Sequence, residues 1–355
     1  DLYLFISGRV DPENYPNPVS SYIYRNDSKN GHILFTDVTK TVAKDLINIG
    51  MVCDAVWTDF DNDGWQDLVL AGEWMPVTFL KNNKGVFKNV TDASGIQNQT
   101  GWWNSIAAGD FDNDGKTDYV VGNLGQNSFY RASEQYPVRA YGKDFDNNGI
   151  YDMIPSLYLP DINGEKKEFP ANTRDDLLKQ INAMRKKFPT YKSYATATMD
   201  QVLTEQERKG ALVVEANNFQ TCMLHNDGHG KFSMRALPQQ AQFSVINGMA
   251  VEDFDGDGNL DLIMNCNDFG TEVSVGRYDA LNGLYLKGDG KGGFSPETIL
   301  QSGIFIPGNG KALVQLKGAG GKYLLAAGQN RGALKIFELK KPARLLPLQA
   351  SDVSV

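Results

Sequence analysis

Four nine-residue segments of the chain repeat one aspartate-rich pattern. They read DFDNDGWQD at 59–67, DFDNDGKTD at 110–118, DFDNNGIYD at 144–152 and DFDGDGNLD at 253–261. Each has an acidic or amide side chain at positions 1, 3, 5 and 9 and a glycine at position 6. Carboxylates held this close together repel one another unless a cation balances them. The chain must therefore adopt a fold that gathers acidic turns at intervals and neutralises their charge.

The spacing within each segment predicts a calcium site. When such a loop curls, side chains 1, 3 and 5 converge, glycine 6 permits the sharp turn, and a carbonyl at position 7 and a carboxylate at position 9 add oxygens. The pattern matches the first half of an EF-hand loop but lacks its glutamate at position 12 and its flanking helices. We expect about four Ca²⁺ sites. The expected ligands are Asp59, Asp61, Asp63, Trp65, Asp67, Asp110, Asp112, Asp114, Lys116, Asp118, Asp144, Asp146, Asn148, Ile150, Asp152, Asp253, Asp255, Asp257, Asn259 and Asp261.

Charge, hydropathy and cysteine content exclude several other classes of protein. The formal net charge is −8, and the basic tract at 185–187 is short, so nucleic acid is not an expected partner. No apolar run approaches the roughly 18–20 residues that span a bilayer, so no membrane span is expected. The three cysteines lack Cys-x-x-Cys spacing and lie in apolar runs, which favours buried free thiols. A zinc site at His225 and His229 is not expected, because further ligands are missing.

The segments around the aspartate loops have the pattern of short strands. Around 59–67 the expected strands are 52–58, 68–72, 77–82 and 86–91. Polar residues with glycine between β-prone runs predict hairpins at 24–35, 80–87, 224–232 and 286–294. Short four-stranded units at regular spacing predict an all-β fold, a calcium-binding β-propeller. We expect seven blades, with six as the alternative, because the region 137–240 can be divided into one blade or two.

The distances between the loops predict one incomplete unit and one insertion. The loops begin 51, 34 and 109 residues apart, and the short step predicts a blade that lacks a strand. The long step includes 173–188, which has helical periodicity and a possible capping box formed by Thr173 and Asp176. A second helical stretch is expected near 198–208. We therefore expect one propeller domain over 1–355, with a helical insertion at 172–209.

The loops, together with 125–149, 174–180, 243–262 and 276–280, resemble the FG-GAP/VCBS repeats of integrin-like propellers. More closely, the chain resembles bacterial relatives of cartilage acidic protein, in which an ASPIC/UnbV domain often follows the repeats. The resemblance covers nearly all of the chain and implies a calcium-binding propeller that is exported, to an extracellular, cell-surface or periplasmic location. The start of the chain, DLYLFISG, is similar to DLVLAGEW at 67–74, which follows a loop. We therefore expect a fragment of a longer protein, without the ASPIC/UnbV domain.

Blade geometry predicts a ligand face. Successive strand connections alternate between the two faces of a propeller, so the calcium loops lie on one face and the connections between strands 2 and 3 on the other. Long or unusual segments fall mostly in the second class, and arginine and aromatic side chains suit contacts with a sugar or a protein. Alternatively, these residues only hold the loops in place. The candidates are Arg9, Trp74, Arg174, Asp175, Arg277, Tyr278 and Asp279.

These features favour a binding module: a calcium-stabilised extracellular β-propeller that recognises a glycan or protein ligand. The alternatives are a polysaccharide lyase or hydrolase, and a structural spacer for a C-terminal domain. The sequence has no nucleophile elbow, no HExxH motif and no persuasive histidine-based pair, so no catalytic residue is assigned and an enzyme is the less favoured reading. Asp175 and Asp279 would serve as a carboxylate pair only if the fold brought them together.

Overall fold

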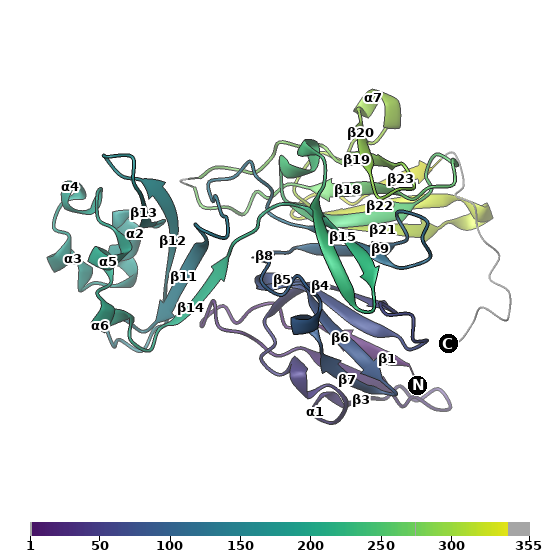
Figure 1. Ribbon diagram of the computed structural model, residues 1–355, viewed down its shortest axis with the longest axis horizontal. Coiled ribbons are helices and arrows are strands. Elements are labelled where there is room, and N and C mark those ends of the chain that lie inside the picture. The colour runs from purple at the N-terminus through teal and green to yellow at the C-terminus, as the bar shows by residue number, and fades with distance from the viewer. Residues whose placement is uncertain (1, 274, 340–355) are drawn as a thin grey trace. The chain divides into compact units, whose positions relative to one another are not determined.

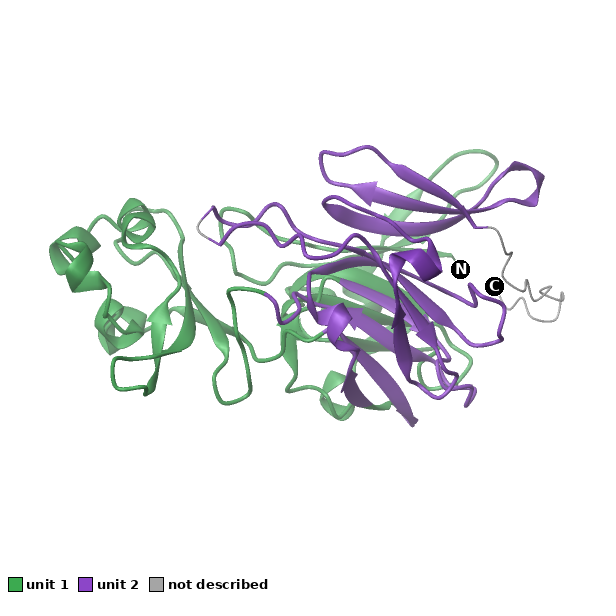
Figure 2. Cartoon of the chain, turned by 90° about the horizontal axis from the view of Figure 1, so that it is seen from above, with its two compact units in different colours: residues 1–104, 128–220, 230–232 green, residues 105–127, 221–229, 233–355 purple. Residues whose placement is uncertain are grey.

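The computed structural model describes residues 2–273 and 275–339, and its chain is mostly β (Figure 1). Its strands form six antiparallel sheets within these residues, which confirms the expected all-β class. The chain divides into two compact units, coloured separately in Figure 2. Unit 1 contains the described residues up to 104, together with 128–220 and 230–232, and unit 2 contains 105–127, 221–229 and the described residues from 233 onward.

Unit 1 begins with two sheets that surround the first aspartate loop. Strands β1 (Tyr3–Ile6), β2 (Tyr22–Asn26) and β3 (Phe35–Asp37) form the first, in that order. The second consists of β4 (Met51–Thr58), β5 (Asp67–Pro76), β6 (Thr78–Asn83) and β7 (Val86–Asn89), and β8 (Thr100–Trp102) also pairs with β5. The short helices are α1 (Thr39–Val42), η1 (Lys44–Leu46) and η2 (Thr91–Ala93). The four strands expected around 59–67 are confirmed.

The third sheet of unit 1 contains the third aspartate loop and the helices. Its strand order is β13 (Lys166–Pro170), β12 (Asp152–Pro160), β11 (Val138–Lys143), β14 (Leu212–Ala216). Between β13 and β14 lie α2 (Arg174–Gln180), α3 (Met184–Lys187), α4 (Tyr191–Tyr194), α5 (Met199–Val202) and α6 (Glu205–Arg208). Thr173 caps α2 as expected, since its side chain accepts a hydrogen bond from the Asp176 amide. The expected helix 173–188 is interrupted after Gln180, although Leu177, Ile181 and Met184 still share one buried cluster.

Unit 2 contains the second and fourth aspartate loops. Strands β9 (Ser105–Gly109), β10 (Asp118–Gly122), β15 (Cys222–Gly228) and β16 (Lys231–Ala236) form one sheet, although the first two residues of β16 group with unit 1. The next sheet is β17 (Ile246–Glu252), β18 (Asp261–Cys266), β19 (Leu284–Gly288) and β20 (Phe294–Glu297). The last is β21 (Gly310–Lys317), β22 (Tyr323–Gln329) and β23 (Lys335–Leu339). The short helices are η3 (Gln239–Gln242), α7 (Ile299–Ser302) and η4 (Ala319–Gly321).

The short step between the second and third loops has a different cause from the one expected. The sheet that begins with β9 and β10 does not lack a strand: it is completed by β15 and β16, which follow in sequence only after the whole sheet 138–216. The prediction of an incomplete unit was therefore wrong. A sheet and its helices are inserted between the second and third strands of another sheet, and the third loop belongs to the inserted sheet.

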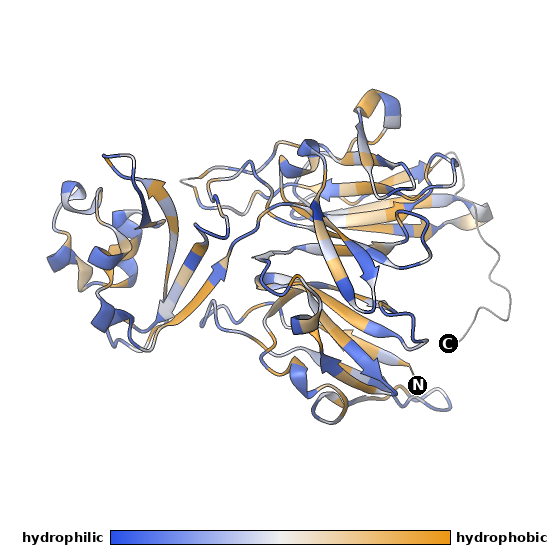
Figure 3. Ribbon diagram, viewed as in Figure 1, coloured by the Kyte–Doolittle hydropathy of each residue, from blue (hydrophilic) through white to orange (hydrophobic). Residues whose placement is uncertain are grey.

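Hydrophobic residues concentrate in the strands and hydrophilic residues in many of the connecting loops (Figure 3). Central strands such as β10 and β18 are buried along their whole length, as expected for strands covered on both sides. Of the expected free thiols, Cys222 and Cys266 are buried and Cys53 is half-buried, and burial raises the pKa of Cys53 and of Cys266 to about 12. Within the described residues, no helix is both long and apolar enough to cross a membrane.

Candidate metal centres

The four aspartate loops share one backbone conformation. In each loop the residues at positions 4 and 6 have positive φ angles, for example 58° at Asn62 and 86° at Gly64. Positions 4 and 6 of the other loops are Asn113 and Gly115, Asn147 and Gly149, and Gly256 and Gly258. Asparagine and glycine are the residues that adopt this left-handed conformation most readily. The glycine at position 6 belongs to the expected calcium-loop pattern, whereas the asparagine or glycine at position 4 was not among the expected features, although the sequence displays it in all four loops.

The first aspartate of each loop holds the turn together. The Asp59 carboxylate accepts hydrogen bonds from the amides of Asp63 (3.0 Å) and Gly64 (2.8 Å). The same pair of bonds recurs at Asp110, Asp144 and Asp253. These bonds fix the position-1 carboxylate against its own loop.

The side chain at position 5 accepts a hydrogen bond from the amide at position 7. In the first loop the Trp65 amide donates to Asp63 Oδ1 at 3.0 Å, and in the third the Ile150 amide donates to Asn148 Oδ1 at 2.7 Å. Lys116 and Asn259 make the equivalent bond in the other loops. The side-chain amide oxygen of Asn148 thus accepts the same hydrogen bond as an aspartate carboxylate does in the other loops, which explains how asparagine fits the third loop. The carbonyl ligands expected at position 7 stay a prediction.

The aspartate at position 9 is the first residue of the next strand, and it is buried. Asp67 is 0% exposed and pairs across the ladder with Thr58. Asp118, Asp152 and Asp261 occupy the same register in their sheets, and none is more than 2% exposed. Each carboxylate accepts a hydrogen bond from the amide of the phenylalanine at position 2. The residue therefore ties the start of the loop to its end.

In three loops the position-9 carboxylate also binds the third strand of the sheet. Asp67 accepts from the Asn82 amide at 2.7 Å, Asp118 from Asn226 at 2.8 Å and Asp261 from Gly288 at 2.9 Å. Burial raises the pKa of Asp67 to about 7, since desolvation disfavours the ionised form. Burial likewise raises the pKa of the other three position-9 aspartates.

Each of these third-strand residues is preceded by a residue that can carry positive charge: Lys81, His225 or Lys287. Lys81 Nζ contacts Asp61 and lies 2.6 Å from Asp63 Oδ2. Lys287 Nζ contacts Asp255 and lies 2.9 Å from Asp257 Oδ2. These three residues were not among the expected site residues, although each is the second residue of an expected hairpin motif, in LKNNKG, LHNDGHG and LKGDGKG.

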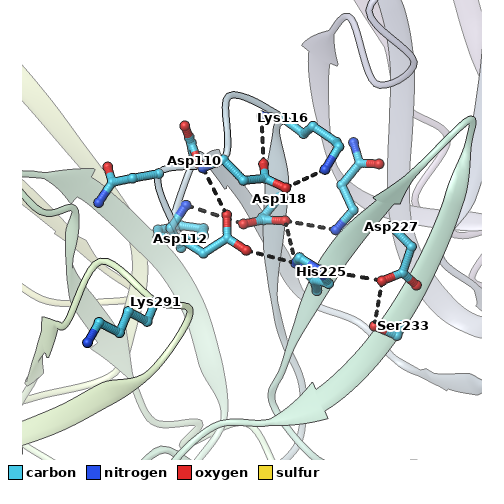
Figure 4. Close-up of polar contacts among 12 residues, drawn as sticks. Asp110, Asp112, Lys116, Asp118, His225, Asp227, Ser233 and Lys291 are labelled. Carbon is cyan, nitrogen blue, oxygen red and sulfur yellow. Dashed lines mark hydrogen bonds and ion pairs between the residues drawn. The ribbon is translucent and has the colours of Figure 1, made fainter.

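In the second loop the equivalent residue is a histidine. Figure 4 shows His225 between the loop and Asp227: its Nδ1 lies 3.3 Å from Asp112 Oδ2 and 3.4 Å from Asp118 Oδ1. Its Nε2 lies 3.4 Å from Asp227 Oδ1. His225 therefore meets aspartates of a loop that lies more than a hundred residues earlier in the sequence, which no local pattern indicates.

The fold brings carboxylate oxygens together in all four loops. Oxygens at positions 1, 3 and 9 lie within 4.8 Å of one another in the first, third and fourth loops, and those at positions 1, 3 and 5 do so in the second. Asp112, Asp118 and His225 form a further group of this kind. These groups could hold a metal ion, and their oxygen donors are compatible with calcium.

Two buried oxygens fit the presence of a cation. Asp61 Oδ1 and Asp146 Oδ1, both at position 3, have no hydrogen-bond partner in the part of the chain that the structure describes. Buried polar atoms are normally satisfied, so an orphaned carboxylate oxygen beside other carboxylates needs a positive partner. The donor set and these orphaned atoms both fit a metal ion held by positions 1, 3 and 9.

The ligand-face candidates of unit 1 make internal contacts. Arg9 pairs with Glu73 at 2.6 Å, and Trp74 is buried, with its indole donating to the Tyr15 hydroxyl at 2.6 Å. Trp74 therefore packs inside unit 1.

Arg174 and Asp175 hold the helical segment together. The Arg174 guanidinium donates to the carbonyls of Phe188 and Pro189, and Asp175 accepts a hydrogen bond from the Tyr191 hydroxyl at 2.6 Å. The alternative, in which these residues hold loops in place, accounts for these contacts.

The candidates of unit 2 lie in the connection between β18 and β19. The Arg277 guanidinium lies 4.9 Å from the centre of the Phe269 ring, and Tyr278 pairs through its backbone with Asp268. Asp279 is exposed. Asp175 and Asp279 belong to different units, so their role as a pair stays a prediction.

Comparison with known sequences supports the repeat. Residues 59–121 match the FG-GAP-like repeat family. This segment contains the first two loops and extends from the end of β4 into β10. A search of the curated proteins gave no match. The relationship to proteins with an ASPIC/UnbV domain stays a prediction.

One solved structure similar to the chain is the crystal structure of the V. cholerae biofilm matrix protein Bap1. The two share 11% sequence identity over 94% of this chain and 70% of that chain, with a TM-score of 0.27. A TM-score this low carries no conclusion about fold or function.

The contacts of the loops predict unequal costs for two substitutions in the first loop. Asp67→Ala leaves the buried amides of Phe60 and Asn82 without an acceptor, which costs about 1–3 kcal/mol for each amide. Asp63→Asn keeps the acceptor for Trp65 and loses a partly exposed ion pair, which costs less than about 1 kcal/mol. Urea unfolding of the chelated protein measures both. Equal losses in the two variants would contradict the structural role given to position 9.

Proposed function

We propose that this chain is an exported, calcium-stabilised β-propeller module that recognises a glycan or a protein ligand. The observation that carries the proposal is the loop geometry, which recurs four times with converging carboxylates and, in two loops, with an orphaned buried oxygen. The FG-GAP-like repeat at 59–121 supports it from sequence. No catalytic residue is assigned.

The sheet order supports blades. In five of the six sheets of the described residues, spatial order follows chain order, as in the strands of a propeller blade. The inserted sheet departs from this order. Its last strand in sequence, β14, pairs with its first, β11, and the third aspartate loop connects β11 to β12. The number of blades stays a prediction.

In this proposal calcium stabilises the turn between the first two strands of a sheet. The aspartates at positions 1, 3 and 9, or 1, 3 and 5 in the second loop, hold the ion, and the loop amides hold the position-1 carboxylate in place. An ion bound by the folded state alone shifts the folding equilibrium by mass action, by about 2.7 kcal/mol per site at a free concentration of 100 times Kd. Calcium is then structural, and recognition depends on other residues.

Lysines compete with calcium in two of the loops. Lys81 and Lys287 already neutralise the carboxylates at positions 3 and 5 of the first and fourth loops. In the first loop Lys81 occupies Asp61 Oδ2 while Oδ1 has no partner among the described residues, so a calcium ion on Oδ1 would bind beside an ammonium group of the same sign. We therefore expect weaker calcium binding in these loops than their carboxylates alone would give.

Thermal unfolding tests the calcium part of the proposal. We expect calcium to raise the melting temperature of chelated protein, and we expect Asp59→Asn with Asp61→Asn to reduce that rise. The exposed Asp92, which lies outside the loops, supplies the matched control Asp92→Asn. If calcium left the melting temperature unchanged in the wild-type protein, the proposal would fail. A further rise with one member of a glycan panel would support recognition, and formation of cleavage products from that glycan would favour an enzyme instead.

Removal of a competing lysine tests the proposed competition. Lys81→Met deletes the ammonium group but keeps a long apolar side chain, so calcium should bind the first loop about two- to fivefold more tightly, the worth of one partly exposed ion pair. The exposed Lys88 of the same sheet gives the control Lys88→Met. Calcium titration calorimetry measures both. Equal or weaker binding by Lys81→Met would contradict the competition.

A further inference from the structure

Unit 2 contains a cavity of about 640 Å³ that the calcium loops do not account for. Three parts of the chain line it: Phe269, Gly270 and Arg277 from the connection between β18 and β19, 307–309 before β21, and 329–333 with Lys335 around the turn between β22 and β23. Strand β18 begins at Asp261, directly after the fourth loop, and ends at Cys266, shortly before Phe269. The cavity therefore lies at the end of β18 away from the calcium loop.

The charged side chains that line the cavity are cationic. They are Arg277, Arg331 and Lys335, and no carboxylate is among the described lining residues. Within residues 2–273 and 275–339, neither arginine forms an ion pair. The neighbouring Asp268 lies 3.5 Å from the ammonium group of Lys311, which offsets its charge. The cavity thus presents two arginines whose charges are available to an anion.

The arginines differ in how they are held. Arg277 lies over the face of Phe269, 4.9 Å from the ring centre, which supports its position and leaves the edge of the guanidinium, where its N–H groups lie, out of this contact. Arg331 is exposed in the turn between β22 and β23 and has a φ of 55°. Lys335 is less available, because its ammonium group donates to the carbonyl of Pro307.

Two buried side-chain amide oxygens of the cavity wall accept no hydrogen bond from the described residues. Asn309 is 6% exposed, and its Oδ1 has no partner among the described residues. Gln329 Oε1 is also buried and unpartnered within the same residues. A Cβ at Gly308 would lie 2.6 Å from Gln329 Oε1, and this glycine has a φ of 117°, so a larger residue there would displace the amide. Ligand hydroxyls would satisfy both oxygens.

These features together define one ligand chemistry. Arginine donates two parallel hydrogen bonds to a carboxylate or a sulfate group, amide oxygens accept hydroxyl donors, and the cavity is large enough for a small saccharide. We propose that this cavity binds an acidic oligosaccharide, with its carboxylate or sulfate groups on Arg277 and Arg331 and its hydroxyls on Asn309 and Gln329. The inference rests on the proposed recognition function and names its ligand class.

Calorimetry on the calcium-loaded chain tests this inference. The probes are an oligogalacturonate, which carries carboxylates, a heparin-derived oligosaccharide, which carries sulfates as well, and a neutral cello-oligosaccharide. We expect an acidic probe to bind, to weaken as salt is raised, and to lose about tenfold or more in affinity in Arg277→Gln and in Arg331→Gln, the effect of one lost charge-assisted hydrogen bond. The acidic probe that binds more tightly identifies the preferred anionic group.

Arg235 provides the matched control, since it is exposed in the β16 part of unit 2 and does not line the cavity. Arg235→Gln should bind the probes as the wild type does. Unchanged binding in both cavity variants would overturn this site but leave the recognition function standing. Binding of the neutral probe as tight as that of the acidic ones, or no binding of either acidic probe, would overturn the ligand class. The melting temperature with calcium, measured for each variant, separates these outcomes from a loss of folding and from failure of the calcium proposal.

Discussion

The buried carboxylate at position 9 is the interaction on which the loop architecture depends. In the first loop, Asp67 begins a central strand, pairs across the ladder with the residue before the loop, and accepts amide hydrogen bonds from the loop and from the third strand. Asp67 thus connects the first two strands, the start of the loop and the third strand of the sheet. Because the group is desolvated, its charge is costly unless hydrogen bonds or a cation compensate it.

Charge compensation takes different forms in the loops. The first and fourth have a lysine from the third strand, in the second Lys116 of the loop itself contacts Asp114, and the third has an asparagine in place of one aspartate. Each arrangement lowers the net negative charge that a cation must balance. The four loops therefore share one turn conformation but differ in local charge. We expect their calcium affinities to differ for this reason. The cavity of unit 2 has the opposite polarity, with cationic side chains at the other end of β18.

Local features of the fold could be read from the sequence. The strands around 59–67, the cap at Thr173 and the shared loop pattern were all predictable, because each depends on residues that are close in sequence. Asn62 and its equivalents were visible but were not used. The hairpin motifs likewise displayed Lys81, His225 and Lys287, but their contact with the aspartates requires knowledge of which strands pair.

Long-range features could not be read in this way. The completion of the β9–β10 sheet by β15 and β16 depends on pairing across an inserted sheet, and no period in the sequence records it. Trp74 was expected on a ligand face, but its ring packs against Trp102, 5.0 Å away between ring centres. The cavity also depends on long-range packing, since Arg277 and Arg331 line one cavity although they are far apart in sequence.

The number of calcium ions bound per chain tests the central claim most directly. Calorimetric titration of fully chelated protein should give about four ions, one for each loop. Replacing Asp144 and Asp146 with asparagine should remove one of them, because these residues supply two of the three converging carboxylates of the third loop. If the wild-type protein bound no calcium at millimolar free concentration, the loops would be hydrogen-bonded turns whose charge is partly balanced by lysines, and the account of a calcium-stabilised fold would be wrong.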